Sequence, residues 1–396
     1  MRTLKVIFMV SILLSMFYSC KETELSPIEK DSIAPGQISN SMVENLPGAA
    51  NITYSLPGDP DILYVQAIYK NPAGQDMEFK SSYYNNSVKV EGFADSSDHN
   101  VELYVVDRSG NRSNPVKVTV TPKTPPYLQT YKSLMLTRDF GGINVNFKNL
   151  SKAELAIVIS TPDSTGKMKV KTTFNTARDS ANIAIRGYEA LPRLFTVSVR
   201  DKWGNTSNVL SKELTPIYEI QLDKKKFREM SLPGDAACTF WSGAMRYAWD
   251  GKVLQDGPEF GLHTGNAVTG EPKFITFDLG VLAKLSRFSQ QTVADDRHWY
   301  ADVSMRRYEV WGTAQYNPNG SFDGWTKLAT VTNVKPSGLP SGLLNEDDRV
   351  AGRIGDEANI PTDMPNVRYI RIRCLQNWSG NTNMVISEVT FWGNDK

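Results

Sequence analysis

Apolar and polar residues alternate along several stretches of the first third of the chain, starting near residue 50. A period of two places one set of side chains in a core and the other in solvent, which predicts half-buried β-strands. Segments rich in Pro, Gly, Asp and Asn separate the stretches, as at 57–60 and 108–111, and predict turns. This spacing is typical of a small β-sandwich. The predicted strands include Leu63 and centre on residues 52–54, 63–69, 88–90 and 101–105.

The chain also contains an internal repeat. The segment 105–114 recurs at 199–208, and the Thr-Pro pair at 121–122 recurs with the same offset at 215–216. The offset is about the length of an immunoglobulin-like domain, so the repeat predicts two tandem sandwich modules. The predicted modules span residues 48–122 and 123–220.

Each copy of the repeat is a strand that ends in a glycine-containing turn. Glycine can adopt positive φ there, while Asp and Asn side chains hydrogen-bond the local backbone. We therefore interpret Asp107 and Asp201 as turn formers, with calcium binding as the alternative. The pair of modules resembles tandem fibronectin type III-like modules. Prolines at 122, 125 and 126 predict a stiff joint between them.

A third domain is predicted from residue 225 to residue 396, because the composition changes after Pro216. Five of the eight tryptophans lie between Trp241 and Trp325. Six short motifs then follow one another; each is weak alone, and their succession is specific. They lie at 249–251, 273–280, 307–312, 324–328, 367–372 and 386–393.

The succession resembles the discoidin domain, also called the coagulation factor type C domain, over about residues 235 to 394. That domain is a jelly-roll sandwich shared with many galactose-binding modules. The resemblance and the alternation together predict an all-β chain. Its expected architecture is two tandem immunoglobulin/fibronectin-like β-sandwiches followed by a discoidin-like jelly-roll β-sandwich.

Two strands of the third domain are predicted in more detail. Phe274 and Thr276 are expected in a core strand that ends in a tight turn at 278–280. Further on, Arg371 and Arg373 are expected to point outward. Their apolar neighbours, expected to point inward, are Ile370, Ile372 and Cys374.

The amino terminus has the order of a secretory signal. Arg2 and Lys5 precede an apolar run of about a dozen residues, which is shorter than the roughly 20 needed to span a bilayer. The run ends at Ser19-Cys20, so we expect residues 1–19 to be removed and Cys20 to carry a lipid. An ordinary signal peptide with a chance cysteine is the alternative.

The residues after Cys20 indicate where the anchored chain lies. Lys21-Glu22-Thr23-Glu24 resembles the acidic tag of surface lipoproteins in Bacteroidetes-type bacteria. This resemblance implies an outer-membrane lipoprotein exposed at the cell surface. Residues 20–47 are polar and lack a strand or helix period, so they are interpreted as a flexible spacer.

Charge and cysteine content exclude several classes of partner and fold. The 396 residues carry 44 Lys and Arg against 43 Asp and Glu, a formal net charge of +1, and the charges are scattered. No basic stripe is present to bind nucleic acid. Beyond Cys20 only Cys238 and Cys374 remain. They could form one disulfide, but we favour a buried, inert thiol for Cys374.

Ligand contacts are expected in loops at one end of the discoidin-like sandwich. The loop residues Arg297, His298, Trp299 and Tyr300 combine charge with aromatic rings, a composition that suits sugars. Trp378 and Asn381 form a second candidate, and the segment 259–263 a weaker third. The alternative for Trp299, Tyr300 and Trp378 is packing at the sandwich edge.

The resemblance also implies a structural calcium site, although no cofactor is required for the predicted function. In many relatives of this fold, calcium lies between an early Asp-Gly turn and an acidic residue of the last strand. The corresponding residues here are Asp250 and Glu388. Lys252 replaces the usual second acidic residue, which departs from the family pattern.

Catalysis has little support in the sequence. No pair of carboxylates stands out for glycoside hydrolysis, and none of the three histidines lies beside a nucleophile-elbow motif. The layout resembles lipoproteins of Bacteroidetes-type polysaccharide-utilisation loci. We therefore predict non-catalytic capture of polysaccharide or oligosaccharide at the cell surface. The alternatives are docking to an outer-membrane transporter and, less favoured, a glycoside hydrolase.

Overall fold

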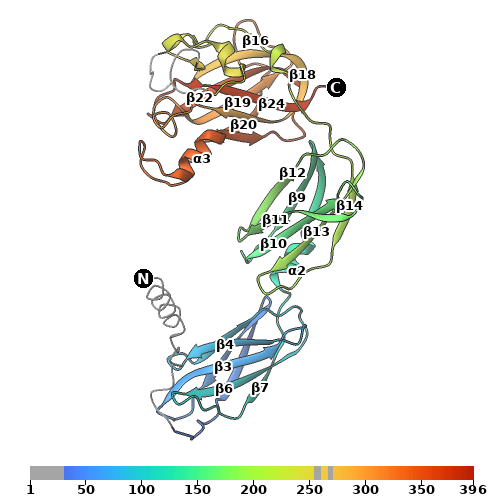
Figure 1. Ribbon diagram of the computed structural model, residues 1–396, viewed down its shortest axis with the longest axis vertical. Coiled ribbons are helices and arrows are strands. Elements are labelled where there is room, and N and C mark those ends of the chain that lie inside the picture. Colours follow the sequence, from blue (N-terminus) through green and yellow to red (C-terminus); the bar gives the residue numbers. More distant parts are fainter. Residues whose placement is uncertain (1–30, 254–259, 266–270) are drawn as a thin grey trace, which may run out of the picture.

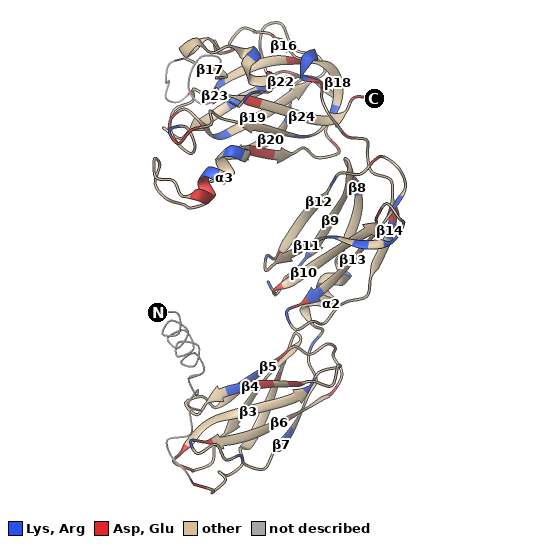
Figure 2. Ribbon diagram, viewed as in Figure 1, with Lys and Arg blue, Asp and Glu red and all other residues tan. Residues whose placement is uncertain are grey.

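The computed structural model describes residues 31–253, 260–265 and 271–396. The chain forms three β-rich domains that follow one another from the amino to the carboxyl end (Figure 1). Basic and acidic residues are interspersed over all three domains (Figure 2). No helix in the described ranges is long and apolar enough to cross a membrane. Cys20 and the 21–24 tag lie outside the described residues, so the lipid anchor stays a prediction.

The first domain is a sandwich of two antiparallel sheets. One sheet has the order β1-β2-β5 and the other β4-β3-β6-β7. Their facing sides enclose a core that includes Ile52, Val65, Val90 and Leu103. The strands are β1 (Ser39–Leu46), β2 (Ala49–Ser55), β3 (Ile62–Lys70), β4 (Asp76–Ser82), β5 (Ser87–Glu91), β6 (His99–Asp107) and β7 (Val116–Val120).

Two details of the first domain differ from the sequence prediction. Strand β1 lies in the segment interpreted as a spacer. Its backbone pairs with β2 while most of its side chains face solvent, so its sequence is polar. A register shift between Ile62 and Tyr64 in β3 turns Ile62 into the core and leaves Leu63 44% exposed. Backbone pairing and bulges of this kind leave no apolar alternation in the sequence.

The second domain repeats the arrangement, with sheets β12-β9-β8 and β11-β10-β13-β14. Its first element, helix α2 (Pro126–Lys132), starts with proline at its first position, where the missing N–H costs no hydrogen bond. The proline-rich joint therefore leads directly into a helix. The strands are β8 (Met135–Asp139), β9 (Gly142–Lys148), β10 (Leu155–Pro162), β11 (Met168–Thr176), β12 (Ser180–Ile185), β13 (Arg193–Asp201) and β14 (Leu210–Leu214).

The repeated turns have the same geometry in both domains. Asp107 Oδ1 accepts the backbone N–H of Asn111 at 2.8 Å, and Asp201 Oδ1 accepts that of Asn205 at 2.9 Å. In each turn the asparagine Nδ2 also donates to the second carboxylate oxygen at 2.9 Å. Both aspartates are turn formers, as predicted.

The third domain is a larger sandwich around one apolar core. Its main sheet has the order β15-β24-β18-β22-β19-β20, with β16 and β21 also paired to β18, and β17 pairs with β23. The elements are β15 (Ile220–Gln221), η1 (Lys224–Lys226), β16 (Arg228–Glu229), η2 (Phe240–Ser242), η3 (Met245–Trp249), β17 (Leu262–His263), β18 (Lys273–Gln291), β19 (Met305–Thr313), β20 (Thr326–Thr332), α3 (Glu346–Ile354), β21 (Asp356–Asn359), β22 (Val367–Asn377), β23 (Val385–Ile386) and β24 (Glu388–Asn394).

Strand β18 joins the two layers of this sandwich. Its first part pairs with β22 and its second part with β24, with a register shift between Asp278 and Ala283. Gly280 lies in the shift at φ +68°, and a Cβ there would lie 2.1 Å from the Lys226 carbonyl oxygen. Only glycine fits this bend. The all-β fold class, three sandwiches in series, is confirmed.

The predicted core strand is present as β18, and two details of the third domain differ from the expectation. The core side chains of β18 are Ile275, Phe277 and Leu279, while Phe274 and Thr276 lie on the opposite face. Arg371 shares that opposite face but is fully buried.

The loop after β19 covers Arg371. The guanidinium lies between the rings of Phe274, Phe322 and Trp325, 4.4–4.7 Å from their centroids. Its Nε donates to Thr276 Oγ1 at 2.9 Å and its Nη1 to the Gly320 carbonyl at 3.2 Å. Alternation gave the face of Arg371 correctly, but it does not reveal that a loop covers that face.

Cys238 and Cys374 are both free and buried. Burial raises the pKa of each thiol to about 12. A thiol with such a pKa stays protonated at neutral pH and reacts slowly. The predicted burial of Cys374 is confirmed, and the raised pKa of its thiol agrees with the prediction that it is inert.

Candidate functional site

The predicted binding loops meet at one end of the third domain. One loop joins β18 to β19 and carries residues 292–304; the other joins β22 to β23 and carries residues 378–384. The Trp378 backbone N–H donates to the Ser304 carbonyl at 3.0 Å. The rings of Tyr300 and Trp378 meet edge to face, with centroids 5.6 Å apart. The structure therefore brings the two predicted sets of residues together.

Trp299 and Tyr300 are buried at this end, only 6% and 5% exposed. Helix α3 lies across Trp299: a Cβ added at Gly352 would come 2.6 Å from the indole Cγ, and the Arg353 guanidinium lies 5.6 Å from the ring. Burial raises the pKa of Tyr300 to about 12. A sugar cannot stack on rings that protein already covers, so we correct their interpretation from sugar contact to edge packing.

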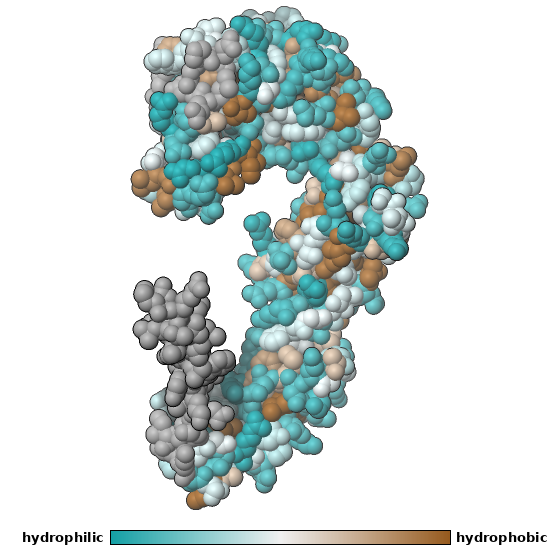
Figure 3. Space-filling model, viewed as in Figure 1, coloured by the Kyte–Doolittle hydropathy of each residue, from teal (hydrophilic) through white to brown (hydrophobic). Residues whose placement is uncertain are grey.

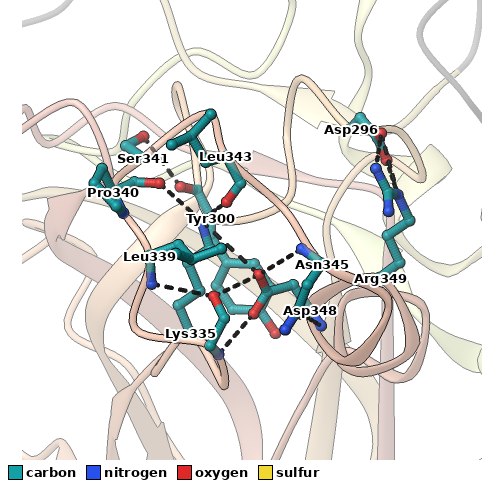
Figure 4. Close-up of polar contacts among 11 residues, drawn as sticks. Asp296, Tyr300, Lys335, Leu339, Pro340, Ser341, Leu343, Asn345, Asp348 and Arg349 are labelled. Carbon is teal, nitrogen blue, oxygen red and sulfur yellow. Dashed lines mark hydrogen bonds and ion pairs between the residues drawn. The ribbon is translucent and has the colours of Figure 1, made fainter.

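A loop of residues 333–345 reinforces this cover, as Figure 4 shows. Lys335 and Asp348 are buried, with Nζ and Oδ2 4.0 Å apart. Lys335 Nζ donates to the carbonyls of Pro340, at 2.8 Å, and Leu343. Ser341 Oγ donates to the Tyr300 carbonyl at 3.2 Å. The loop is thus fixed both internally and to the aromatic pair.

Asp348 organises the start of α3. It accepts hydrogen bonds from the backbone N–H and hydroxyl of Ser337 at 2.9 and 2.7 Å, and from the Asn345 N–H at 3.1 Å. Desolvation alone would raise the pKa of this carboxyl, but these hydrogen bonds and Lys335 outweigh it and lower the pKa below its usual value. Arg349 adds a two-pronged contact to Asp296 at the surface.

The space beneath the cover is too small for a sugar. A cavity of about 20 Å³ lies between Trp299, Tyr300 and Asp356. That volume holds about one water molecule. Tyr308 and Asn333 donate hydrogen bonds to Asp356 at 3.0 and 2.6 Å, and burial raises the pKa of this carboxyl.

His298 and Arg297 differ in their surroundings. His298 is buried, and its Nδ1 lies 2.8 Å from Asp295 Oδ1, which also accepts the backbone N–H groups of Arg297 and His298. His298 therefore has a structural place in the turn, which corrects its interpretation as a surface contact. The side chain of Arg297 is 71% exposed and lies 3.4 Å from Asp295 Oδ2.

Trp378 and Asn381 lie closer to the surface. The Trp378 indole N–H donates to Asn333 Oδ1 at 2.9 Å, and the Arg306 guanidinium lies 4.7 Å from its ring. Both Trp378 and Asn381 are partly exposed. The backbone N–H of Asn381 donates to Asn377 Oδ1 at 2.8 Å, which fixes the loop. These two residues remain candidates.

The sequence interpretation missed the most exposed aromatic pair of this domain. Trp241 is 71% exposed and Phe240 41%, and their rings meet at 5.7 Å. Phe240 also stacks on His263 at 5.5 Å. Trp241 and Ser242 have φ of 47° and 61°, a left-handed conformation that is uncommon outside glycine. Adjacent aromatics before a Ser-Gly pair were the available signal.

The same end of the sandwich positions this aromatic pair. A backbone bridge joins Thr239 to His263, and β17 pairs with β23, which directly follows the 378–384 loop. In the weaker third candidate segment, Phe260 and His263 are buried, and Glu259 lies outside the described residues.

The residues at the expected calcium position do not fit a calcium ion. Glu388 is buried, its Oε1 pairs with Lys224 Nζ, and its Oε2 accepts the Gly251 N–H at 3.1 Å. Asp250 Oδ1 accepts the backbone N–H of Lys252 at 2.9 Å. Burial raises the pKa of Glu388, and Lys224 opposes that shift.

Calcium binds six to eight oxygens. The Lys224 ammonium group already pairs with the Glu388 carboxylate, so a calcium ion at this position would be repelled by a charge of the same sign. Over the part of the chain that the structure describes, no three acidic, His or Cys residues are grouped to hold a metal.

The fold is that of a multidomain sandwich protein. The end of the third domain that carries the 292–304 and 378–384 loops and the Phe240–Trp241 pair, called the loop end below, is its candidate ligand surface. A solved structure described as a SusE-like protein is 55% identical over 44% of this chain, covers 100% of that protein, and has a TM-score of 0.43. The chain belongs to the SusE-like proteins.

Three family models also match, each described as a domain of unknown function. They cover residues 35–122 (DUF4959), 123–225 (DUF5126) and 249–393 (DUF5000). No curated protein matches the chain.

Other solved structures resemble the chain only weakly. The CBM32 and M60 domains of Clostridium perfringens ZmpB are 10% identical over 44% of this chain and 15% of that one, with a TM-score of 0.32. Two fibronectin type III domains of chicken tenascin are 13% identical over 45% and 98%, with a TM-score of 0.22. These values support no functional inference. The discoidin resemblance stays a prediction.

Proposed function

We propose that this chain captures polysaccharide or oligosaccharide without catalysis, through the loop end of its third domain. The observation that carries the proposal is the exposed Phe240–Trp241 pair on a left-handed turn. Sugar rings stack their C–H faces on aromatic rings, and amide or charged groups take their hydroxyls. Trp378, Asn381 and Arg297 supply such groups on the neighbouring loops.

The left-handed backbone supports a binding role for Trp241. A non-glycine residue held at positive φ costs about 1–3 kcal/mol, and such residues cluster at ligand clamps and active sites. Holding an exposed indole at this cost has no packing benefit for the core. It does preorganise the ring for a ligand, which reduces the entropy lost on binding.

Membership among SusE-like proteins supports a place for this chain at the outer surface of a Bacteroidetes-type cell. A lipid on Cys20 would hold it in the outer membrane, and the first two domains would separate the binding end from the lipid. A single acyl chain anchors a protein only marginally, so the lipidated cysteine would need several.

Affinity electrophoresis of the chain from residue 21, run through gels that each contain one polysaccharide, tests the proposal. Retardation by at least one polysaccharide, reduced in Trp241→Ala and Trp378→Ala, is the expected result. Tyr84→Ala is the matched control, because Tyr84 is 81% exposed on the first domain. Equal retardation in all three variants would reject the loop end as the binding surface. Released reducing sugar would favour the hydrolase instead.

Docking to an outer-membrane glycan transporter is the second candidate. The observation that favours it is a set of exposed apolar side chains on α3 and the loop before it. Figure 3 shows apolar side chains gathered along the side of the domain that carries α3. The exposed residues are Val334, Leu339, Leu343, Val350 and Ile354. Co-purification of a transporter that Val350→Asp and Ile354→Asp abolish, with unchanged polysaccharide retardation, would support docking as a separate role.

A further inference from the structure

The joint between the first two domains contains a cavity far from the loop end. It measures about 440 Å³ and is lined by both domains, from β5 on one side to the repeated turn of the second domain on the other. Small-molecule sites commonly measure about 300–1,000 Å³ and often lie at domain interfaces. The joint therefore has the size and the position of a binding site.

Hydrogen bonds between the domains give the joint a defined shape. Asn205 Nδ2 donates to the Gly92 carbonyl at 3.0 Å, and Tyr127 Oη donates to the Ala94 carbonyl at 2.7 Å. The Gly48 N–H donates to the Lys123 carbonyl at 2.9 Å. Both walls of the cavity are thus held in register.

Trp203 lies in this cavity, at a position where the two repeats differ. Its counterpart in the first repeat is Ser109, at the same place in the turn. The Trp203 indole packs on Gly92, where a Cβ would come 2.9 Å from its Cγ, and meets Phe79 edge to face at 5.8 Å. The ring remains partly exposed and lines the cavity.

The charges around Trp203 balance. The cavity is lined by three basic and three acidic residues, which favours a neutral ligand over an ionic one. These residues are Lys89, Lys152, Lys202, Glu91, Glu154 and Asp201. Lys202 Nζ lies 3.7 Å from Glu154 Oε2 and 5.2 Å from the Trp203 ring centroid. Lys152, which also lines the cavity, is held at φ 52°, a left-handed conformation that is uncommon outside glycine.

The cavity continues into an open groove of about 710 Å³ along the second domain. The two share four lining residues, Glu154, Leu155, Asp201 and Lys202, so they form one continuous surface. The groove adds hydrogen-bonding groups from Asn175, Thr176 and Arg200. A chain-like ligand with many hydroxyls fits this combination better than a compact one.

We infer that the joint between the first two domains is a second saccharide site, which takes a neutral oligosaccharide with one sugar ring against Trp203. The rest of the oligosaccharide extends along the groove toward Asn175. This site goes beyond the proposed loop-end site and shares with it only the class of ligand. Two sites on one chain would increase the apparent affinity for a polymer by simultaneous engagement.

Isothermal titration of the chain from residue 21 tests this inference with maltohexaose, cellohexaose, xylohexaose and mannohexaose as probes. For at least one probe we expect a second binding event that persists in the Trp241→Ala, Trp378→Ala double variant. Trp203→Ala should weaken that event by about ten-fold or more, as truncation of a central aromatic anchor does. If the joint is the only site, the double variant will bind a probe as the unmodified chain does. That result would reject the loop end and still support the joint.

Rim variants separate binding from stabilisation of the joint, because Trp203→Ala also removes a contact between the domains. Lys202→Ala and Lys89→Ala change exposed residues of the cavity wall and should each weaken the second event several-fold. Lys169→Ala, exposed on β11 outside the cavity, is the matched control. If all three lysine variants bind like the unmodified chain, or if only the loop end binds any probe, the inference is overturned. Stronger binding of a hexagalacturonate than of every neutral probe would also overturn it.

Discussion

Two aromatic pairs at the loop end of the third domain have similar compositions and opposite surroundings. Trp299 and Tyr300 are 6% and 5% exposed beneath α3, while Phe240 and Trp241 are 41% and 71% exposed. Trp241 and Tyr300 both have a left-handed backbone, so strain alone does not distinguish the pairs. The cover formed by α3 and the 333–345 loop decides which pair can meet a ligand.

The cover makes a strong prediction about stability. Trp299→Ala should lower the free energy of unfolding by about 3–5 kcal/mol, the usual cost of removing a buried aromatic side chain. Trp299 packs tightly against Gly352, so removal of the ring would leave a cavity. Chemical denaturation followed by tryptophan fluorescence and circular dichroism would measure the loss. A change below about 1 kcal/mol would mean that α3 does not cover the ring in solution.

The buried pair beneath the cover gives the next largest effect. Asp348→Ala should destabilise the third domain by about 3 kcal/mol, because it leaves Lys335 as an uncompensated buried charge. Glu346→Ala is the matched control, since its side chain is 68% exposed on the same helix. Differential scanning calorimetry should show a lower melting temperature for the first variant alone. Equal melting temperatures would contradict a closed, buried pair.

The features that the sequence could predict differ from those that it could not in how far apart the contacting residues lie along the chain. The Asp107 and Asp201 turns and the burial of Cys374 followed from local pattern, because turns and strand alternation depend on neighbouring residues. The covered state of Arg371 and Trp299 did not. The 314–325 loop covers Arg371, and α3 covers Trp299. Each covering segment is distant in the sequence from the residue that it covers.

The calcium expectation was limited in a similar way. The replacement of an acidic residue by Lys252 is visible in the sequence, but no local pattern connects Lys224 with this position. Its ammonium group reaches Glu388 from 164 positions away. The exposed position of Trp241 could not be predicted for a related reason. Alternation identifies residues that belong in a core, and it carries no signal for an aromatic ring held in solvent on a turn.

Acidification should lower the free energy of unfolding of the third domain, because Asp348 becomes protonated. The pKa of Asp348 is lower in the folded chain than its usual value of about 4. Its stabilising contribution is therefore complete above pH 4 and is lost as the pH falls through the folded-state pKa. The loss is at most part of the Asp348→Ala effect. Urea unfolding at pH 7, 5 and 3 should show a stability loss at pH 3 that is smaller in Asp348→Asn; an equal loss would assign it to other carboxyls.

The exposed pair should respond in the opposite way to the buried pair. Trp241→Ala should change the free energy of unfolding by no more than about 0.5 kcal/mol, as is usual for exposed positions. Its affinity for the retained polysaccharide should fall by about ten-fold, which corresponds to about 1.4 kcal/mol. Parallel denaturation and titration measurements would check both values. A destabilisation near that of Trp299→Ala would remove the distinction between the two pairs.

The smallest expected effect concerns the backbone that presents Trp241. Ser242→Gly should stabilise the fold by up to about 1 kcal/mol, because glycine adopts φ near 61° without the steric cost paid by serine. The same change lets the turn sample more conformations before a ligand binds, so affinity should fall by about two-fold through lost preorganisation. Ser379→Gly, on the neighbouring exposed loop, is the control. If Ser242→Gly binds more tightly than the unmodified chain, the left-handed turn opposes binding, and Trp241 would have to move before it could stack on a sugar.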